Sequence, residues 1–185
     1  MKNTILFFSV ISLLSFYSCG EDDGNAPLCP DGFEGDNCAE QTNTKFLGTY
    51  QVEMYGQLNG TIGGLATLTL DAGTEQNPKT TTATITQGLN DGPDEVRINV
   101  VLPLAASGSI DSDFNIPVEI VGEVRNSIEY YIPQTSIGFS FNAFGIPASA
   151  NLSFGIDGVF EGDTLVSTLN GGADFNGTIV MRGIR

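Results

Sequence analysis

The chain has 185 residues, 23 of them glycine, and it contains neither histidine nor tryptophan. This length fits one ordinary domain with a real core, while the lack of histidine removes the commonest metal ligand and general acid or base near neutral pH. The formal net charge is -15 and the few basic residues are scattered singly. We therefore expect no nucleic-acid partner, no metal, no cofactor and no catalytic activity.

The amino terminus has the layout of a signal peptide. Lys2 is followed by an uncharged apolar run over residues 5–17 and then by the small residue Ser18. This run is too short for a helix that spans a membrane, which needs about 20 residues. We therefore predict that residues 1–18 are a signal peptide and take no part in the fold.

The sequence "SFYSC" at residues 15–19 resembles the lipobox of bacterial lipoproteins, in which a small residue precedes the cysteine that receives the lipid. The resemblance implies that Cys19 is lipidated and anchors the chain to a membrane. Cleavage after Gly20 without lipidation is the alternative. The acidic "EDD" behind Cys19 is similar to the export signal of lipoproteins of the Bacteroidota, which implies an outer-membrane location facing outward.

Residues 19–45 are expected to form a tether that holds the domain away from the membrane. If Cys19 carries a lipid, the other two cysteines, Cys29 and Cys38, remain as a pair. The sequence between them, "CPDGFEGDNC", resembles the last disulfide loop of an EGF-like module, with Gly32 and Phe33 at matching positions. The resemblance implies a Cys29–Cys38 disulfide, which requires an oxidising compartment.

The upstream cysteines of a complete EGF-like module are missing, so its calcium-binding and receptor-binding roles are not carried over. We predict that the loop is a stapled spacer. Two alternatives remain open, namely a contact through an exposed Phe33 and an ion site built from Asp31, Glu34 and Asp36.

Residues 46–185 are predicted to form one all-β domain. About nine segments alternate apolar and polar residues, and turn signals separate them at fairly even spacing. The segments are 48–54, 66–71, 82–87, 95–102, 114–122, 136–144, 150–160, 164–170 and 177–183. The turn signals are Asn59-Gly60, Asp71-Ala72-Gly73, Asn90-Asp91-Gly92-Pro93, Gly162-Asp163 and Asn170-Gly171-Gly172. Short connections favour an antiparallel meander of about 8–9 strands that closes as a barrel or a sandwich.

The opening of this domain, "FLGTYQV" at residues 46–52, resembles the first strand of lipocalin-like (calycin) domains, with Gly48-Thr49-Tyr50 in place of their Gly-x-Trp pattern. The resemblance implies a β-barrel whose mouth is able to hold a small apolar ligand.

A hairpin rich in phenylalanine is predicted in the middle of the domain, where residues 136–156 carry no charge. Phenylalanines at alternate positions of a strand point to one face, and we expect this face to be core. The alternative is that Phe139, Phe141 and Phe154 line a ligand cavity.

Catalytic groupings that depend on histidine cannot be assembled. A pair of carboxylates acting as in glycosidases is the remaining catalytic alternative, and its candidates on predicted strands are Glu119, Glu123, Glu129, Asp157 and Glu161. The segment "DSDFN" at residues 111–115 has alternating oxygen ligands but lacks the glycine of a calcium loop, so we interpret it as a turn leading into a strand.

These observations predict a membrane-anchored lipoprotein that displays a non-catalytic β-domain, with a protein, a glycan or an apolar molecule as its partner. The domain acts either as a binding module or as an accessory component beside a larger envelope assembly. The main alternative is a lipocalin-like carrier of a small apolar ligand in a cavity lined by phenylalanines.

Overall fold

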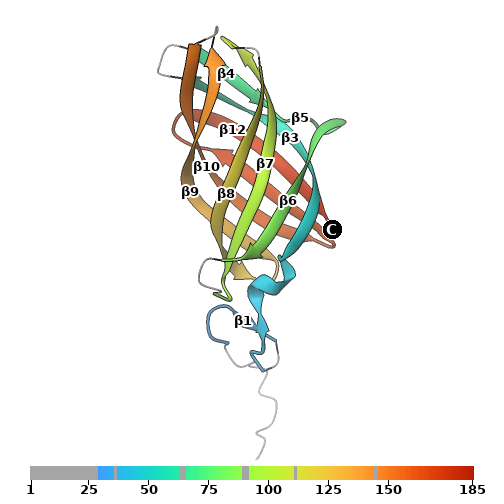
Figure 1. The fold of residues 1–185 in the computed structure, drawn as a ribbon. Helices are drawn as coiled ribbons and strands as arrows, with labels where there is room; N and C mark the ends of the chain where they lie inside the picture. The colour runs from blue at the N-terminus through green and yellow to red at the C-terminus, as the bar shows by residue number, and fades with distance from the viewer. Residues whose placement is uncertain (1–28, 36, 63–65, 89–91, 111, 144–145) are drawn as a thin grey trace, which may run out of the picture.

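The computed structural model describes residues 29–35, 37–62, 66–88, 92–110, 112–143 and 146–185. Figure 1 shows a β-barrel standing on a small N-terminal stalk. The stalk contains β1 (Phe33–Glu34), β2 (Glu40–Gln41) and the 3-10 helix η1 (Thr42–Lys45). The barrel region contains β3 (Gly48–Ile62), β4 (Ala66–Asp71), β5 (Gly73–Thr74), β6 (Asn77–Gln87), β7 (Glu95–Gly108), β8 (Ser112–Asn126), β9 (Glu129–Ala143), β10 (Ile146–Glu161), β11 (Thr164–Gly171) and β12 (Phe175–Ile184).

The barrel is an antiparallel meander that closes on itself. From β7 to β12 each strand pairs with the next one in the chain, and β12 returns to pair with β3. Strands β6 and β4 together fill the strand position beside β3. Strand β6 pairs with residues 48–54 of β3, and β4 pairs with residues 57–62. Both short strands also pair with β7. The result is a closed barrel of eight strand positions, which confirms the predicted all-β meander.

All nine predicted segments are strands, and most are longer than the sequence pattern indicated. The turn predicted at Asn59-Gly60 is wrong, because both residues lie inside β3. Gly60 stands there because a Cβ atom at this position would collide with the carbonyl oxygen of Asp174. The glycine therefore permits a close approach of two backbone segments rather than a chain reversal.

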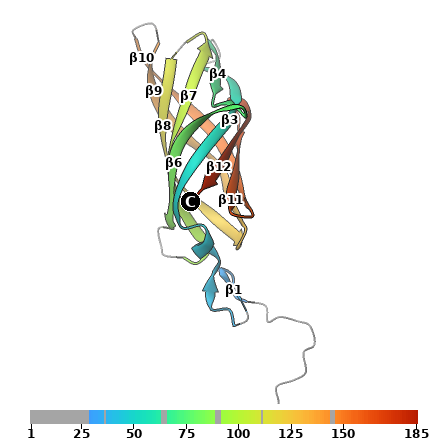
Figure 2. The same cartoon turned by 90° about the vertical axis from the view of Figure 1, so that its right-hand side faces the viewer.

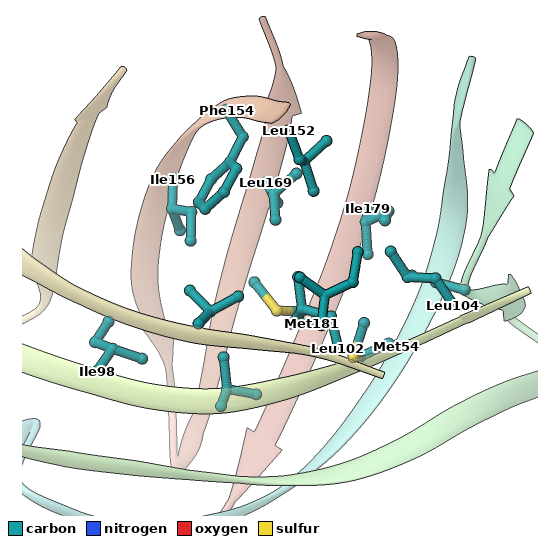
Figure 3. Close-up of a cluster of buried hydrophobic side chains, with 14 of the residues drawn as sticks. Met54, Ile98, Leu102, Leu104, Leu152, Phe154, Ile156, Leu169, Ile179 and Met181 are labelled. Carbon is teal, nitrogen blue, oxygen red and sulfur yellow. The ribbon is translucent and has the colours of Figure 1, made fainter. Parts of the chain in front are cut away.

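The core occupies the inside of the barrel. Every second residue of β8 from Phe114 to Val124 is buried, as expected for a strand with one face towards a core. Figure 3 shows how side chains from different walls meet in the middle, for example Leu102 of β7 and Met181 of β12. The interior is thus filled with apolar side chains that pack against one another.

The stalk is held together by a disulfide and by main-chain hydrogen bonds. Cys29 and Cys38 form the expected disulfide. The backbone N–H of Thr42 donates to the carbonyl oxygen of Gly32 at 3.0 Å, which ties the disulfide loop to η1. None of the described residues forms a helix long and apolar enough to cross a membrane.

Candidate functional site

The middle of the barrel offers little space. One cavity of about 30 Å³ remains among the core side chains, which is room for a single water molecule. Its wall is apolar except for Tyr50, Tyr130 and Ser167. The described part of the interior therefore has no chamber at this point for an apolar ligand.

Tyr130 and Ser167 form a polar pair beside this cavity. The Tyr130 hydroxyl and Ser167 Oγ lie 2.7 Å apart, and both residues are buried. Burial raises the pKa of Tyr130 to about 12, although the hydrogen bond to Ser167 acts in the opposite direction. Tyr130 is therefore a neutral phenol at physiological pH, and the pair is a satisfied structural contact.

The barrel end next to the stalk, which we call the stalk end, is closed by Tyr50 and Arg185. The Tyr50 hydroxyl donates to the carbonyl oxygen of Phe46 at 2.8 Å and accepts from Arg185 Nε at 3.0 Å and Nη2 at 2.7 Å. The guanidinium also lies 5.1 Å from the centroid of the Tyr50 ring, within the range of a cation–π contact. Burial raises the pKa of Tyr50 above its usual value. The tyrosine of the lipocalin-like motif thus closes this end.

Helix η1 completes the closure of the stalk end. Asn43 is fully buried, and its Nδ2 donates to the carbonyl oxygens of Gly92 and Glu95 at 2.8 and 2.9 Å. The hydroxyl of Thr42 donates to the carbonyl oxygen of Pro93 at 3.0 Å. These bonds fix η1 to the chain segment that enters β7.

The opposite end of the barrel, the far end, has a break in its wall between β8 and β9. Strand β8 pairs with β7 over residues 112–123, but it pairs with β9 only at residues 123, 124 and 126. In Figure 2 the β9–β10 hairpin stands to the left of β8 at this end. A hollow of about 280 Å³, which we call the β8/β9 slot, is lined by residues 112–116 and 139–141.

Three phenylalanines lie at the slot. Phe114 of β8 contacts Phe139 and Phe141 of β9 with ring centroids 5.6 and 5.7 Å apart. Each of the three side chains is 8% exposed. Aromatic packing therefore connects β8 to β9 at the far end, where the described residues show no ladder between these strands.

The phenylalanines singled out from the sequence have two different positions. Phe154 is fully buried in the core, whereas Phe139 and Phe141 border the β8/β9 slot. None of the three lines the central cavity. Phe144 and the predicted lipidation site Cys19 lie outside the described residues.

The candidate carboxylates do not converge in the interior. Glu119, Glu123, Glu129, Asp157 and Glu161 are all exposed on the outer wall. Glu119 Oε1 lies 3.4 Å from Arg97 Nη1. Glu123, together with Asp31 and Glu34, borders a hollow of about 410 Å³ between the stalk and the barrel. Within the described ranges, no group of three or more acidic, cysteine or histidine residues is placed to hold a metal ion, and Asp36 lies outside them.

The sequence reasoning missed the slot, and the chain carries only a weak signal for it. Pro117 lies in β8 and Pro133 lies in β9. Proline cannot donate to a ladder and is therefore confined to sheet edges and bulges. The two prolines agree with unpaired edges on these strands but do not single them out, because β7 and β10 also contain a proline, Pro103 and Pro147.

The chain matches no protein-family model, no curated protein and no solved structure. Its function therefore has to be inferred from its own residues and geometry.

Proposed function

We propose that the protein is an exported lipoprotein of the outer membrane, anchored through Cys19, whose barrel makes non-catalytic contacts at the cell surface. Residues 1–18 serve as the signal peptide, residues 19–45 as the tether and residues 46–185 as the displayed domain. The short apolar leader and the lipobox-like sequence support export and lipidation. The Cys29–Cys38 disulfide supports an oxidising location outside the cytoplasm.

One observation carries the contact function, namely the filled barrel. Pockets for small molecules usually have about 300 to 1,000 Å³, whereas the central cavity has about 30 Å³. A molecule bound by this barrel therefore meets its outer surface or one of its ends. A displayed barrel of this kind serves as a rigid support for a contact surface.

Metabolic labelling with an alkynyl fatty acid tests the anchor. We expect the wild-type chain to be labelled and retained in the membrane, and we expect Cys19→Ala to lose both properties. The double variant Cys29→Ala/Cys38→Ala is the matched control, because it removes two cysteines and should keep the label. A Cys19→Ala chain that is labelled and retained like the wild type contradicts the proposed anchor.

The carrier function is the second candidate, and the position of Phe114, Phe139 and Phe141 at the border of the β8/β9 slot favours it. Native mass spectrometry of the exported chain distinguishes the two functions. The contact function predicts the mass of the polypeptide with its covalent lipid. A stoichiometric, non-covalent apolar molecule that survives purification would establish the carrier function instead.

A further inference from the structure

The β8/β9 slot exposes two strand edges that face each other. Residues 112–122 of β8 pair only with β7, and β9 pairs only with β10 beyond residue 131. Each edge carries main-chain N–H and C=O groups at the regular spacing of a β-strand, except that Pro117 of β8 and Pro133 of β9 have no N–H. Such groups need a hydrogen-bonding partner when they are removed from water. The slot is therefore chemically suited to another strand.

Apart from Pro133, the outer face of β9 carries few of the devices that usually protect an edge strand. Natural edges are commonly protected by charged side chains, but the chain carries no charge from residue 130 to residue 156. Over residues 132–141 the exposed positions of β9 are Pro133, Gln134, Ser136, Gly138 and Ser140, and the three nearest the slot carry short side chains or none. Such side chains leave the backbone of β9 open to an approaching strand.

The two faces of an added strand would meet different surroundings. Its inward side chains would lie over the apolar cluster of Phe114, Phe139 and Phe141. Its outward side chains would lie beside Asp113 and Glu119 of β8, whose side chains are 88% and 65% exposed, although each also has a basic neighbour in the chain, Lys79 Nζ at 4.0 Å and Arg97 Nη1 at 3.4 Å. Because side chains alternate between the faces of a strand, the preferred sequence alternates apolar and basic residues.

We propose that the β8/β9 slot accepts an extended basic segment of a partner protein, which pairs with β8, with β9 or with both as an additional strand. This inference deepens the proposed contact function and rests on it. Recognition combines main-chain hydrogen bonds, apolar contacts to the three phenylalanines and attraction to the acidic outer face of β8.

The chemistry of the slot favours a peptide over the other ligand classes. A hydrocarbon chain has no groups that pair with the main-chain donors and acceptors of the two edges. A sugar ring usually stacks on the face of an aromatic side chain, but the three phenylalanines expose only 8% of their surface. An extended peptide supplies hydrogen-bonding groups at the same spacing as the edges.

Hydrogen exchange of the exported chain, measured with and without a probe peptide, tests the proposal. The probe is acetyl-Lys-Val-Lys-Val-Lys-Val-Lys-amide. In the free protein, we expect rapid exchange at alternate amides of residues 112–122 and 132–141, because they face the slot. The peptide should slow exchange at these amides on at least one edge by about tenfold or more and leave the β10–β11 ladder unchanged.

A peptide control separates strand pairing from simple charge attraction. The same peptide with main-chain N-methyl groups on all of its lysine and valine residues keeps its charge but loses the N–H donors of both of its edges. We expect this peptide to bind at least about tenfold more weakly, which corresponds to the loss of main-chain hydrogen bonds. Equal binding of the two peptides means that charge alone attracts them, and it overturns the proposal.

Protein variants locate the charge contribution. Asp113→Asn/Glu119→Gln should weaken binding about tenfold at low salt, whereas Glu53→Gln/Glu161→Gln should change it less than about twofold. Glu53 and Glu161 are also exposed strand residues, so both double variants remove two negative charges. Equal effects of the two double variants contradict a role for the acidic face of β8.

Three further outcomes overturn the proposal. The first is that the slot amides are already protected from exchange in the free protein. The second is that the peptide fails to bind at millimolar concentration. The third is that decanoate or a dextran oligosaccharide protects these amides while the peptide does not. None of them affects the fatty-acid labelling or the native mass, which are measured without peptide. Failure of the slot and failure of the proposed function are therefore distinguishable.

Discussion

The two ends of the barrel are held together in different ways. At the stalk end, Phe46 is fully buried, Tyr50 makes three hydrogen bonds and Asn43 makes two more. Strands β8 and β9 also pair there, at Glu123–Tyr131, Val124–Tyr130 and Asn126–Glu129, with an irregularity between Val124 and Asn126. At the far end, β8 and β9 are connected in the described residues through the side chains of Phe114, Phe139 and Phe141.

The difference suggests separate roles for the two ends: the stalk end attaches the barrel to the stalk, and the far end carries the proposed contact with a partner. Local stability depends on buried contacts and on paired main-chain groups, and it varies across a fold. The stalk end has both, which fixes the stalk to the barrel. The far end lacks part of the ladder, so a partner is able to supply the missing hydrogen bonds. Binding at that end therefore leaves the attachment unchanged.

The largest expected effect is at Phe46. Its ring lies 5.6 Å from the ring of Tyr130 and 5.1 Å from that of Phe160. Because Phe46 is fully buried, Phe46→Ala leaves an enclosed cavity, and we expect a loss of about 5 kcal/mol in the free energy of unfolding. Chemical denaturation of the exported chain measures this loss.

Phe141→Ala is the comparison at the far end. Phe141 borders the slot, so water and the neighbouring rings are able to fill part of the space left by the substitution. We expect a loss of about 3 kcal/mol, at the lower limit for the removal of a buried phenylalanine. A loss at Phe141 that equals or exceeds the loss at Phe46 contradicts the difference between the two ends.

The second expected effect is at Asn43. Asn43→Ala removes the donor to the part-buried carbonyl oxygens of Gly92 and Glu95, although the Gly92 oxygen still accepts from the N–H of Glu95 at 3.4 Å. Each unsatisfied buried group costs about 1 to 3 kcal/mol. Asn43 Oδ1 has no hydrogen-bond partner of its own, so losing this atom offsets part of the cost. We expect a net loss of about 2 to 3 kcal/mol by chemical denaturation.

Thr44→Ala is a suitable control for Asn43→Ala. Thr44 belongs to the same helix η1 but is exposed. We expect it to change the free energy of unfolding by less than about 0.5 kcal/mol, as for most surface positions. Similar losses for both variants would mean that η1 tolerates no substitution and that the bonds of Asn43 are not special.

The architecture was predictable because alternation and turn residues are local signals. The segment 66–71 was predicted residue for residue as β4, and the uncharged hairpin was predicted from its composition. The exception, the turn predicted at Asn59-Gly60, depends on a distant neighbour. Gly60 is explained by the carbonyl oxygen of Asp174, more than a hundred positions away, and no local pattern contains that contact.

The candidate site was less predictable than the fold. The sequence brought Phe139 and Phe141 together, because alternate residues of one strand share a face. It did not identify Phe114 as their partner, because the register across β8 and β9 is broken. Pro117 and Pro133 agree with unpaired edges on both strands but do not single them out. A slot that results from missing strand pairing is therefore difficult to predict from the sequence of residues along each strand.

The third expected effect is an alkaline loss of stability caused by Tyr130. The unfolded chain releases this phenol proton near the ordinary pKa of 10.0, whereas the folded chain keeps it until about pH 12. Between these values the unfolded state binds fewer protons, so stability falls as pH rises. The loss is about 2 to 3 kcal/mol at 1.36 kcal/mol per pKa unit, and denaturation at pH 9 to 12 measures it.

Tyr130→Phe isolates this titration. The variant loses the hydrogen bond to Ser167, so it should be less stable than the wild type at pH 9 by about 1 kcal/mol. Its stability should fall less steeply above pH 10, because one buried phenol no longer titrates. Tyr50 remains, and its raised pKa keeps part of the decline. Parallel pH profiles of the two proteins contradict the buried titration.

The smallest expected effect on the barrel follows from opening the disulfide. A bond that closes about ten residues contributes roughly 3 kcal/mol in the chain-entropy model, and we expect this contribution to fall on the stalk, where both cysteines lie. Cys29→Ser/Cys38→Ser should therefore make residues 29–41 sensitive to protease. Residues 42–185 keep the contacts of Asn43 and Tyr50, and we expect their free energy of unfolding to change by less than about 1 kcal/mol.

Lys45→Ala provides the control for this last comparison, because Lys45 Nζ lies 3.2 Å from Glu34 of the disulfide loop. The Lys45 side chain is 54% exposed, and exposed ion pairs contribute about 0 to 1 kcal/mol. The variant should leave both protease sensitivity and barrel stability nearly unchanged. If opening the disulfide lowers the stability of the barrel as much as Phe46→Ala does, the stalk is part of the barrel core, and attachment and contact are not separate functions of the two ends.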